Sequence, residues 1–297
     1  MSALTVPESF RAMPRWWHDD AGRTWLDTLP ALVEEHCGTW GLVVDGEPWH
    51  GSNALVVPVR RDGEPLALRL APPGDDVAQE VRALRLWAGR GTVRLVDADL
   101  GARATLLERL EGSRTLQDEP LDVALPVLGA LMRTLAVPVP DDVPSTSEVA
   151  AGLRDSLEAG WRAVGQPTPR RQLDHALACA AERAGVPAGD RAVNADLHVG
   201  QVLAAERAPW LVVDPVLLRG DREHDLGRVL WSRLDELPDD AAVRHAFRTV
   251  VDAAEVPAER AASWVVLRSM SYLVWGLERG LTIDPPRCRR LLDLFCG

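Results

Sequence analysis

The chain contains no lysine, so all 33 of its basic side chains are arginine, and 44 aspartates and glutamates oppose them. The net charge of −11 argues against a general nucleic-acid-binding protein, because such proteins neutralise phosphates with a basic excess. An acidic chain is compatible with solubility and with a positively charged small-molecule ligand. Any chemistry that elsewhere uses a lysine ammonium must here use a guanidinium group or proceed without one.

Cysteine is also scarce, and Cys37, Cys179, Cys288 and Cys296 form no C-x-x-C pair and no zinc-ligand spacing with histidine. This spacing argues against a disulfide framework and favours a reducing compartment. Residues 1–15 lack the apolar segment of a secretory signal, and no apolar run approaches the roughly 18 residues of a membrane helix. The sequence therefore predicts a cytoplasmic protein without a membrane partner, and it carries no signal for an oligomeric state.

The 297 residues, 46% of them hydrophobic and 26% charged, fit one large domain or two lobes that share a cleft. Hydrophobic periodicity and turn signals predict a lobe over residues 1–110, with an N-terminal helix and a five-stranded sheet interrupted by one helix. Asp62-Gly63 between two short apolar runs is typical of a hairpin. The predicted helices are 14–37 and 75–90, and the predicted strands are 39–44, 54–60, 66–71, 92–97 and 104–110.

Residues 111–297 are mostly helical in pattern, which predicts a larger helical lobe. A polar loop that leads into a strand interrupts the helices at 194–203, and a short strand follows at 210–214. The predicted fold class is therefore α+β, with a small antiparallel sheet lobe followed by a mainly helical one. The predicted helices are 121–135, 147–164 and 171–184, with further helices between 224 and 294.

Three oxygen-bearing side chains in this interruption point to chemistry. Asp196 and Gln201 lie in the polar loop, and Asp214 ends the strand thirteen residues after Gln201. Mg²⁺ prefers oxygen ligands, so a carboxylate and an amide carbonyl at neighbouring strand ends can hold it while substrate phosphates complete its shell. Asp196 would then be available to orient and deprotonate a hydroxyl. The alternative is a polar turn with an aspartate that caps a helix.

The order of these residues resembles the H-x-D-x-x-x-x-N loop and the following metal-binding Asp of phosphotransferases with a protein-kinase-like fold. Residues 194–226, NADLHVGQVLAAERAPWLVVDPVLLRGDREHDL, are similar to HGDLHxGNVL…WLxIDPKxLxGDxxxDL of the streptomycin 6-kinase and hydroxyurea phosphotransferase family, within the aminoglycoside phosphotransferase superfamily. The resemblance spans roughly residues 35 to 280. It implies a bilobal protein-kinase-like fold and Mg²⁺-dependent transfer of the γ-phosphate of ATP to a hydroxyl of an aminoglycoside or a sugar, with hydroxyurea as a family precedent.

The resemblance also implies roles for individual residues. Asp196 corresponds to the base that orients the acceptor hydroxyl, and Asp214 and Gln201 correspond to the metal ligands. For the nucleotide, Arg69 corresponds to the phosphate-binding cation and Glu80 to its carboxylate partner. Gly51, Ser52 and Asn53 correspond to a turn over the phosphates, and the backbone at Glu108 and Leu110 corresponds to the segment that receives the adenine. The implied supporting residues of the catalytic loop are Asn194, His198 and Asp225.

The chain departs from the family pattern at several of these positions. Arg69 stands where the family has Lys, Gln201 where it has Asn, and Asn194 where it has His. Arginine keeps the charge as a planar fork, and glutamine keeps the amide carbonyl with one more methylene. Phosphoryl transfer depends mostly on positioning and electrostatics. A second hypothesis therefore stays open, a nucleotide- or metabolite-binding protein with little or no phosphotransfer.

The residues that would bind the acceptor carry no decodable motif. Asp221 and Glu223 either edge the acceptor site or belong to a solvated turn. Trp275, on a late helix, either stacks on a sugar or packs in the core, and its helical spacing favours the core. The implied partner is a small-molecule acceptor.

Overall fold

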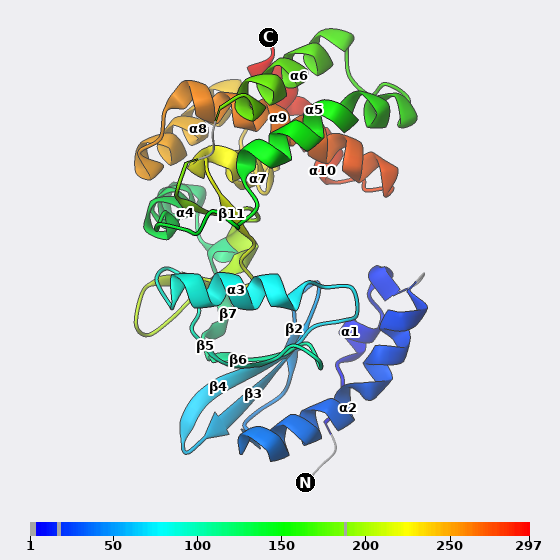
Figure 1. Cartoon of the computed structure of the whole chain (residues 1–297), viewed down its shortest axis with the longest axis vertical. Coiled ribbons are helices and arrows are strands. Elements are labelled where there is room, and N and C mark those ends of the chain that lie inside the picture. The colour runs from blue at the N-terminus through cyan, green and yellow to red at the C-terminus, as the bar shows by residue number, and fades with distance from the viewer. Residues whose placement is uncertain (1–3, 17–18, 187–188) are drawn as a thin grey trace. The chain divides into compact units, whose positions relative to one another are not determined.

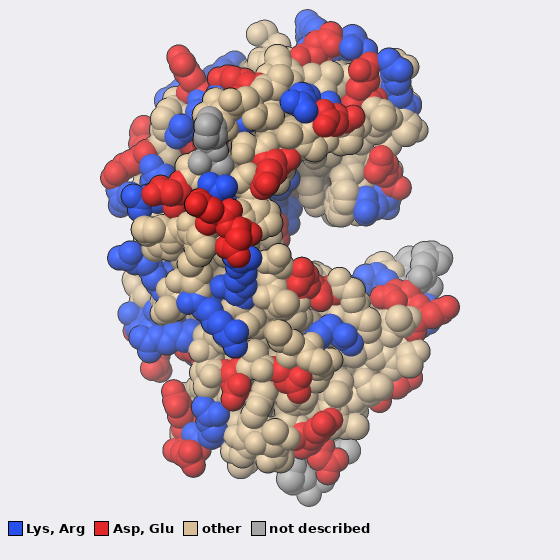
Figure 2. All heavy atoms as spheres, in the orientation of Figure 1, with Lys and Arg blue, Asp and Glu red and all other residues tan. Residues whose placement is uncertain are grey.

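The computed structural model describes residues 4–16, 19–186 and 189–297, and its contacts divide the chain into two compact units, Met1–Glu111 and Gly112–Gly297 (Figure 1). An antiparallel sheet dominates the first unit and helices dominate the second, which confirms the predicted α+β fold class. None of the helices in the described ranges combines the length and the apolar character that crossing a membrane requires. Acidic and basic side chains both appear on the visible faces of the two units (Figure 2).

The described part of the first unit is built on a six-stranded antiparallel sheet in the order β1-β3-β4-β6-β5, with β2 also paired to β3. The predicted hairpin joins β3 and β4. Its turn residues Asp62 and Gly63 have φ values of 52° and 85°, and a type I′ turn requires positive φ at both. The strands are β1 (Val43–Val44), β2 (Trp49–His50), β3 (Leu55–Arg61), β4 (Glu64–Leu70), β5 (Leu95–Asp99) and β6 (Ala104–Glu108).

Two details predicted for this sheet are wrong. The two-residue strand β2 adds a sixth strand to the five that were predicted. The strand predicted over 39–44 shrinks to Val43–Val44 because the preceding helix continues to Trp40. That helix ends at Gly41, whose φ of 63° is the left-handed conformation that commonly terminates helices.

Helices α2 and α3 bury different faces of the first unit (Figure 1). The apolar face of α2 packs with the interior of β3, β4 and β6, and Phe10 meets Trp16 edge-on with ring centroids 5.4 Å apart. The α3 helix begins where the Asp76 carboxylate accepts the Gln79 N–H at 3.1 Å, and it packs Val81 towards β5. The helical segments are α1 (Glu8–Arg11), η1 (Pro14–Trp16), α2 (Asp20–Trp40) and α3 (Val77–Trp87).

The second unit is organised around α9, against which α5, α6, α7 and α10 pack. The buried residues Trp264, Leu267 and Met270 supply its core contacts. The helical segments are η2 (Leu116–Asp118), α4 (Leu121–Leu135), α5 (Thr146–Ala163), α6 (Arg170–Ala184), η3 (Val199–Gln201), η4 (Arg222–Asp225), α7 (Leu226–Trp231), η5 (Leu234–Glu236), α8 (Asp240–Ala254), α9 (Ala258–Glu278) and α10 (Asp284–Phe295).

Short strands in the second unit bring two turns together. Strand β9 pairs antiparallel with β10, and β8 pairs antiparallel with β11. The Val213 N–H donates to Gln201 O at 2.8 Å, and the Ala195 N–H donates to Val216 O at 2.8 Å. The loop after β8 therefore lies beside the turn after β10. The strands are β7 (Glu111–Thr115), β8 (Ala192–Asn194), β9 (Val202–Ala204), β10 (Trp210–Val212) and β11 (Leu217–Arg219).

Candidate functional site

The side-chain amide of Gln201 joins the two aspartates that the sequence singles out. Its Nε2 donates to Asp196 Oδ2 at 2.9 Å and makes a longer contact of 3.4 Å with the backbone oxygen of Asp214. Gln201 lies in η3, directly before β9, and Asp214 follows β10, so the pairing of β9 with β10 fixes both positions. The structure thus brings Asp196, Gln201 and Asp214 together within the second unit.

The donor set at Gln201 and Asp214 fits Mg²⁺. Gln201 Oε1 is buried and has no hydrogen-bond partner, which leaves an amide oxygen with a free coordination site. Within the described ranges no three His, Cys, Asp or Glu side chains are grouped to hold a metal ion, so a closed all-protein site is not formed there. Mg²⁺ does not need one, since it commonly uses one or two carboxylates and takes its other ligands from phosphates and water.

The backbone at Asp214 has an uncommon conformation. Its φ is 54°, in the left-handed region, which asparagine and aspartate enter more readily than other residues with a Cβ. This turn ends the β10 segment and carries the chain towards β11. A tight left-handed turn at this point places the Asp214 carbonyl within reach of the Gln201 amide.

The Asp196 carboxylate has a partner at each oxygen. Gln201 donates to Oδ2, and the Nε of Arg228 lies 3.3 Å from Oδ1. Burial raises the pKa of Asp196, the nearby charge of Asp214 raises it further, and Arg228 and Arg268 oppose both effects. The side chain keeps 39% of its surface exposed, so another molecule can reach it.

Asn194 and Asp225 support the loop through its backbone. Asn194 Oδ1 accepts the Val216 N–H at 3.0 Å and the Asp196 N–H at 3.3 Å. Asp225 Oδ2 accepts the Leu197 N–H at 2.6 Å. These contacts tie the segment 194–197 to the turn before β11 and to the start of α7.

Asp225 and His198, which support this loop, have displaced pKa values. Burial raises the pKa of Asp225 to about 7, and an ion pair with Arg268, 3.2 Å away, opposes the rise. Burial and the charge of Arg228 lower the pKa of His198 to about 3, so this imidazole is neutral at pH 7. His198 Nδ1 accepts the Gly200 N–H at 3.2 Å, a local contact that shapes the loop.

The first unit holds the residues expected to contact a nucleotide. Arg69 on β4 forms a buried ion pair with Glu80 on α3, with Nη1 and Oε2 2.8 Å apart. Gly51, Ser52 and Asn53 form the turn between β2 and β3, as predicted.

Other side chains of the first unit hold this turn in place. Arg15 donates to the Ser52 carbonyl at 3.0 Å and to the Asn53 side chain.

Glu108 ends β6, where its carboxylate accepts the Arg94 N–H at 3.0 Å, and Leu110 follows two residues later.

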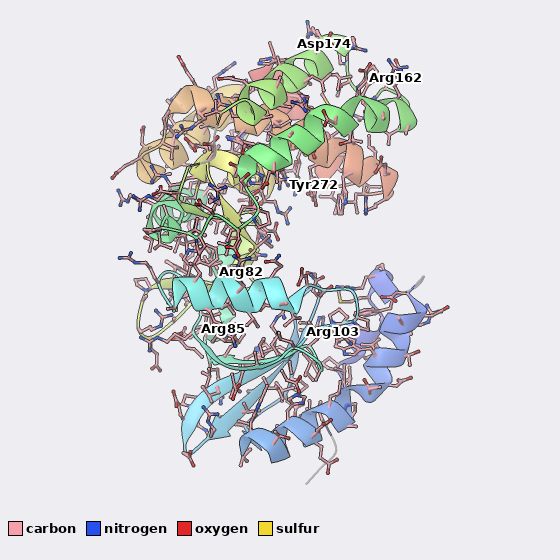
Figure 3. The ribbon with its side chains drawn as sticks, in the orientation of Figure 1. Arg82, Arg85, Arg103, Arg162, Asp174 and Tyr272 are labelled. Carbon is pink, nitrogen blue, oxygen red and sulfur yellow. The ribbon has the colours of Figure 1, made fainter. Side chains whose placement is uncertain are left out.

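Trp275 is not a core residue, contrary to the favoured interpretation of its spacing. It is 40% exposed and continues a row of rings with Trp231 and Tyr272. Tyr272, labelled in Figure 3, stacks on Trp231 with ring centroids 4.7 Å apart and is tilted against Trp275 with centroids 5.0 Å apart. Asp284 lies close enough to the Tyr272 hydroxyl to contribute, with burial, to the raised pKa of that phenol.

The role predicted for Glu223 is wrong on both interpretations. Its side chain is fully buried and accepts a hydrogen bond from Arg260 Nε at 2.7 Å, so it neither edges an acceptor site nor lies in a solvated turn. A carboxylate in the protein interior requires such a charged partner. Asp221 is partly buried, and its Oδ2 accepts the Trp264 indole N–H at 2.8 Å.

Sequence reasoning missed three residues of the site, Arg228, Arg268 and Asp284. Arg228 follows Asp225 by three residues, and helical neighbours at this spacing share a face, so its position was a usable signal. Arg268 of α9 pairs with Asp225, and Asp284 of α10 pairs with Arg228, and each of the two lies more than forty residues after its partner in the chain. Only the packing of these helices brings them to the site.

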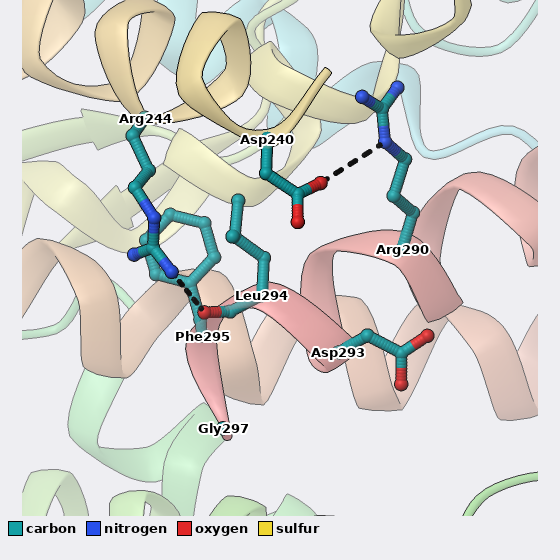
Figure 4. Close-up of a pocket in the computed structure, with 7 residues that line it drawn as sticks. All are labelled: Asp240, Arg244, Arg290, Asp293, Leu294, Phe295 and Gly297. Carbon is teal, nitrogen blue, oxygen red and sulfur yellow. Dashed lines mark hydrogen bonds and ion pairs between the residues drawn. The ribbon is translucent and has the colours of Figure 1, made fainter.

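A cavity of about 560 Å³ lies elsewhere in the second unit, where α8 meets the end of α10 (Figure 4). Its walls carry two arginines and two aspartates, so no charge dominates. Arg244 donates to the Leu294 carbonyl, and Arg290 faces Asp240 across 4.0 Å. These residues are engaged with one another, and none of the predicted site residues lines this cavity.

A family model and curated relatives match most of the length of this chain. Residues 39–280 match the family model described as aminoglycoside/hydroxyurea antibiotic resistance kinase. The streptomycin 6-kinase of Streptomyces glaucescens is 37% identical over 290 residues, which cover 95% of this chain and 94% of that protein. The hydroxyurea phosphotransferase of Kitasatospora aureofaciens is 37% identical over 283 residues, which cover 93% of this chain and 82% of that protein.

Solved structures show the same fold at low sequence identity. Aminoglycoside phosphotransferase APH(4)-Ia, as a variant in a ternary complex with AMP-PNP and hygromycin B, has a TM-score of 0.64 at 16% identity, covering 89% of this chain and 97% of that one. Choline kinase LicA from Streptococcus pneumoniae has a TM-score of 0.59 at 12% identity, covering 89% and 98%. The predicted protein-kinase-like fold is therefore confirmed.

Proposed function

The chain belongs to the aminoglycoside/hydroxyurea antibiotic resistance kinase family and is a small-molecule kinase. From this premise we propose that it transfers the γ-phosphate of ATP, with Mg²⁺, to a hydroxyl of a streptomycin-like aminoglycoside or a related sugar. The observation that carries the proposal is the Gln201 amide, which binds the Asp196 carboxylate while its buried oxygen has no partner. The proposed base and the proposed metal ligand are thus in direct contact.

Asp196 orients the acceptor hydroxyl and accepts its proton as the reaction proceeds. The hydroxyl oxygen forms a bond to the γ-phosphorus, the bond from that phosphorus to the β,γ-bridging oxygen breaks, and ADP leaves. Asp214 and Gln201 Oε1 would hold Mg²⁺, which neutralises phosphate charge when bound. Arg228 and Arg268 favour the ionised form of Asp196, the form that accepts a proton.

In the first unit, Arg69 supplies the charge that would bind the nucleotide phosphates, and Glu80 fixes its guanidinium at 2.8 Å. The turn Gly51–Asn53 would cover the phosphates, and the backbone from Glu108 to Leu110 would receive the adenine. The replacement of lysine by Arg69 preserves the charge in a chain that has no lysine at all.

The exposed ring of Trp275 supports a sugar-like acceptor, because aromatic faces pack well against the apolar faces of such rings. Asp221 is held by Trp264 and is assigned no acceptor contact. The four cysteines are free thiols, which supports action in a reducing cytoplasm where ATP is available.

The test is ADP release from ATP and Mg²⁺ across streptomycin, other aminoglycosides, amino sugars and hydroxyurea. We expect acceptor-dependent turnover with at least one aminoglycoside and a loss of about 10²-fold or more in Asp196→Asn, because that variant keeps the shape but not the base. The exposed residue Asp155, on α5, gives the matched control Asp155→Asn, which should retain full activity.

Two outcomes would contradict the proposal. Unchanged turnover in Asp196→Asn would remove the assigned base. Stabilisation by ATP and Mg²⁺ without ADP release for any acceptor would favour the binding-protein hypothesis instead.

A further inference from the structure

Arg228, on α7, stands against the carboxylate that the proposed mechanism uses. Its Nε lies 3.3 Å from Asp196 Oδ1 as an ion pair without hydrogen-bond geometry, and the other oxygen accepts from Gln201. We propose that Arg228 is the positioning residue of Asp196, whose guanidinium holds this carboxylate in the orientation that meets the acceptor hydroxyl. The kinetic part of this inference rests on the proposed function, whereas its structural part concerns the contact alone.

Arg228 is itself held by aromatic rings and a second carboxylate. Its guanidinium carbon lies 5.6 Å from the ring centroid of Tyr272 and 5.9 Å from that of Trp231. Its Nη1 lies 3.9 Å from Asp284 Oδ2. A planar cation gains both stacking and charge interactions in such surroundings, and only 19% of the Arg228 side chain is exposed. These surroundings therefore stabilise a planar guanidinium group better than a strongly hydrated cation such as an ammonium group.

Asp225 and Arg228 divide the support of the loop between backbone and side chain. Asp225 accepts the Leu197 N–H and so fixes the backbone next to Asp196. Arg228, one helical turn later, faces the Asp196 side chain. Loss of Arg228 should leave the loop backbone in place and release the carboxylate to rotate. The expected defect is in the chemical step, with nucleotide binding retained.

Kinetics separate this role from a purely structural one. With the best acceptor, Arg228→Met should lower kcat between about 10- and 100-fold while KM for ATP stays within about twofold, and Arg228→Lys should recover part of the loss. Arg162→Met, on the exposed face of α5, is the matched control and should keep full activity (Figure 3). An unchanged kcat, or a KM for ATP that rises as kcat falls, would overturn the positioning role.

A second experiment needs no turnover, so it remains decisive even if every acceptor fails and the proposed function is wrong. Arg228→Ala leaves a gap between two rings and two carboxylates, and millimolar guanidinium chloride should fill it. We expect the Tm of Arg228→Ala to rise in a saturable way by about 2 °C or more. The double variant Asp196→Asn/Arg228→Ala should show a clearly smaller rise, because one of the two carboxylates that face the gap is gone.

Arg279→Ala is the matched control for this experiment, since Arg279 also lies over an aromatic ring, 4.4 Å from the Trp275 centroid, but on the exposed surface. It should gain nothing from guanidinium. An equal rise in all three variants, or none in Arg228→Ala, would overturn the inference. If Arg228→Ala does not fold, non-additive unfolding free energies for Asp196→Asn and Arg228→Met test the same contact, and additivity would refute it.

Discussion

At the scale of single residues, Arg69 forms a buried ion pair with Glu80, and this pair should contribute measurably to stability. Replacing Arg69 by Met removes the 2.8 Å partner of a buried carboxylate, and we expect this to lower the free energy of unfolding by about 3 kcal/mol. Glu80→Gln in the same background should recover part of that loss, because it removes the charge that the first change left behind. Urea unfolding of the variants measures both effects, and an Arg69→Met protein as stable as the original would contradict the expectation.

Asp225 makes stability depend on pH. Its pKa is raised to about 7 in the folded protein, from about 3.8 when unfolded, so between these values the folded state binds a proton that the unfolded state does not. This contribution to stability is full below about pH 4 and is lost as pH rises towards 7, by roughly 4 kcal/mol at most. Asp225→Asn should lack it, so the difference in unfolding free energy between the two proteins should change across this window. A difference that is constant with pH would refute the assignment.

At the scale of elements, two helical glycines make opposite predictions. A Cβ added at Gly129 in α4 would lie 2.6 Å from the Ala253 Cβ and 2.8 Å from the Val250 carbonyl of α8, so Gly129→Ala should destabilise the protein by about 1–3 kcal/mol. Gly152 in α5 has nothing within 4 Å, and Gly152→Ala should stabilise by about 0.5–1 kcal/mol because alanine favours helix. Thermal unfolding compares the two, and equal effects would contradict the close packing of α4 and α8.

Local patterns predicted some elements well and others badly. Residues 121–135 form α4 as predicted, because apolar spacing and the preceding proline mark that helix. The first strand begins later than predicted: β-branched residues within 39–44 favour a strand, whereas tertiary packing extends α2 to Trp40 and leaves only Val43–Val44 as β1. Hydrophobic periodicity was thus enough to predict that the helix exists, whereas the boundary between α2 and β1 depended on contacts from outside the segment.

At the scale of the whole molecule, nucleotide binding should appear as a gain in stability, since a ligand that binds only the folded state raises the Tm. We expect ATP with Mg²⁺ to raise the Tm by about 5 °C at a hundredfold excess over Kd, and ATP without Mg²⁺ to raise it less. Asp214→Asn should abolish the Mg²⁺-dependent part. Differential scanning fluorimetry measures these shifts, and an identical rise with and without Mg²⁺ would count against a metal site at Asp214.

The sequence led to Asp196, Gln201 and Asp214 because they lie in one short ordered motif, and the structure places them in contact. It could not predict the burial of Glu223, because its partner Arg260 is 37 residues away on another helix. The spacing of Arg228 from Asp225 was a usable signal for its place on the helix, but the carboxylate that it faces, Asp196, lies in a different segment. Short-range order therefore locates the candidate site residues, and long-range packing decides which charges surround them.

The left-handed φ of 54° at Asp214 determines how this position can be probed by mutagenesis. Alanine disfavours that conformation by roughly 1–2 kcal/mol, so Asp214→Ala would disturb the bend as well as delete the proposed metal ligand, and a loss of activity would report on both at once. Asparagine accepts the same backbone angles and differs from aspartate mainly in charge. Asp214→Asn is therefore the variant that tests the effect of charge at this position without changing the backbone conformation.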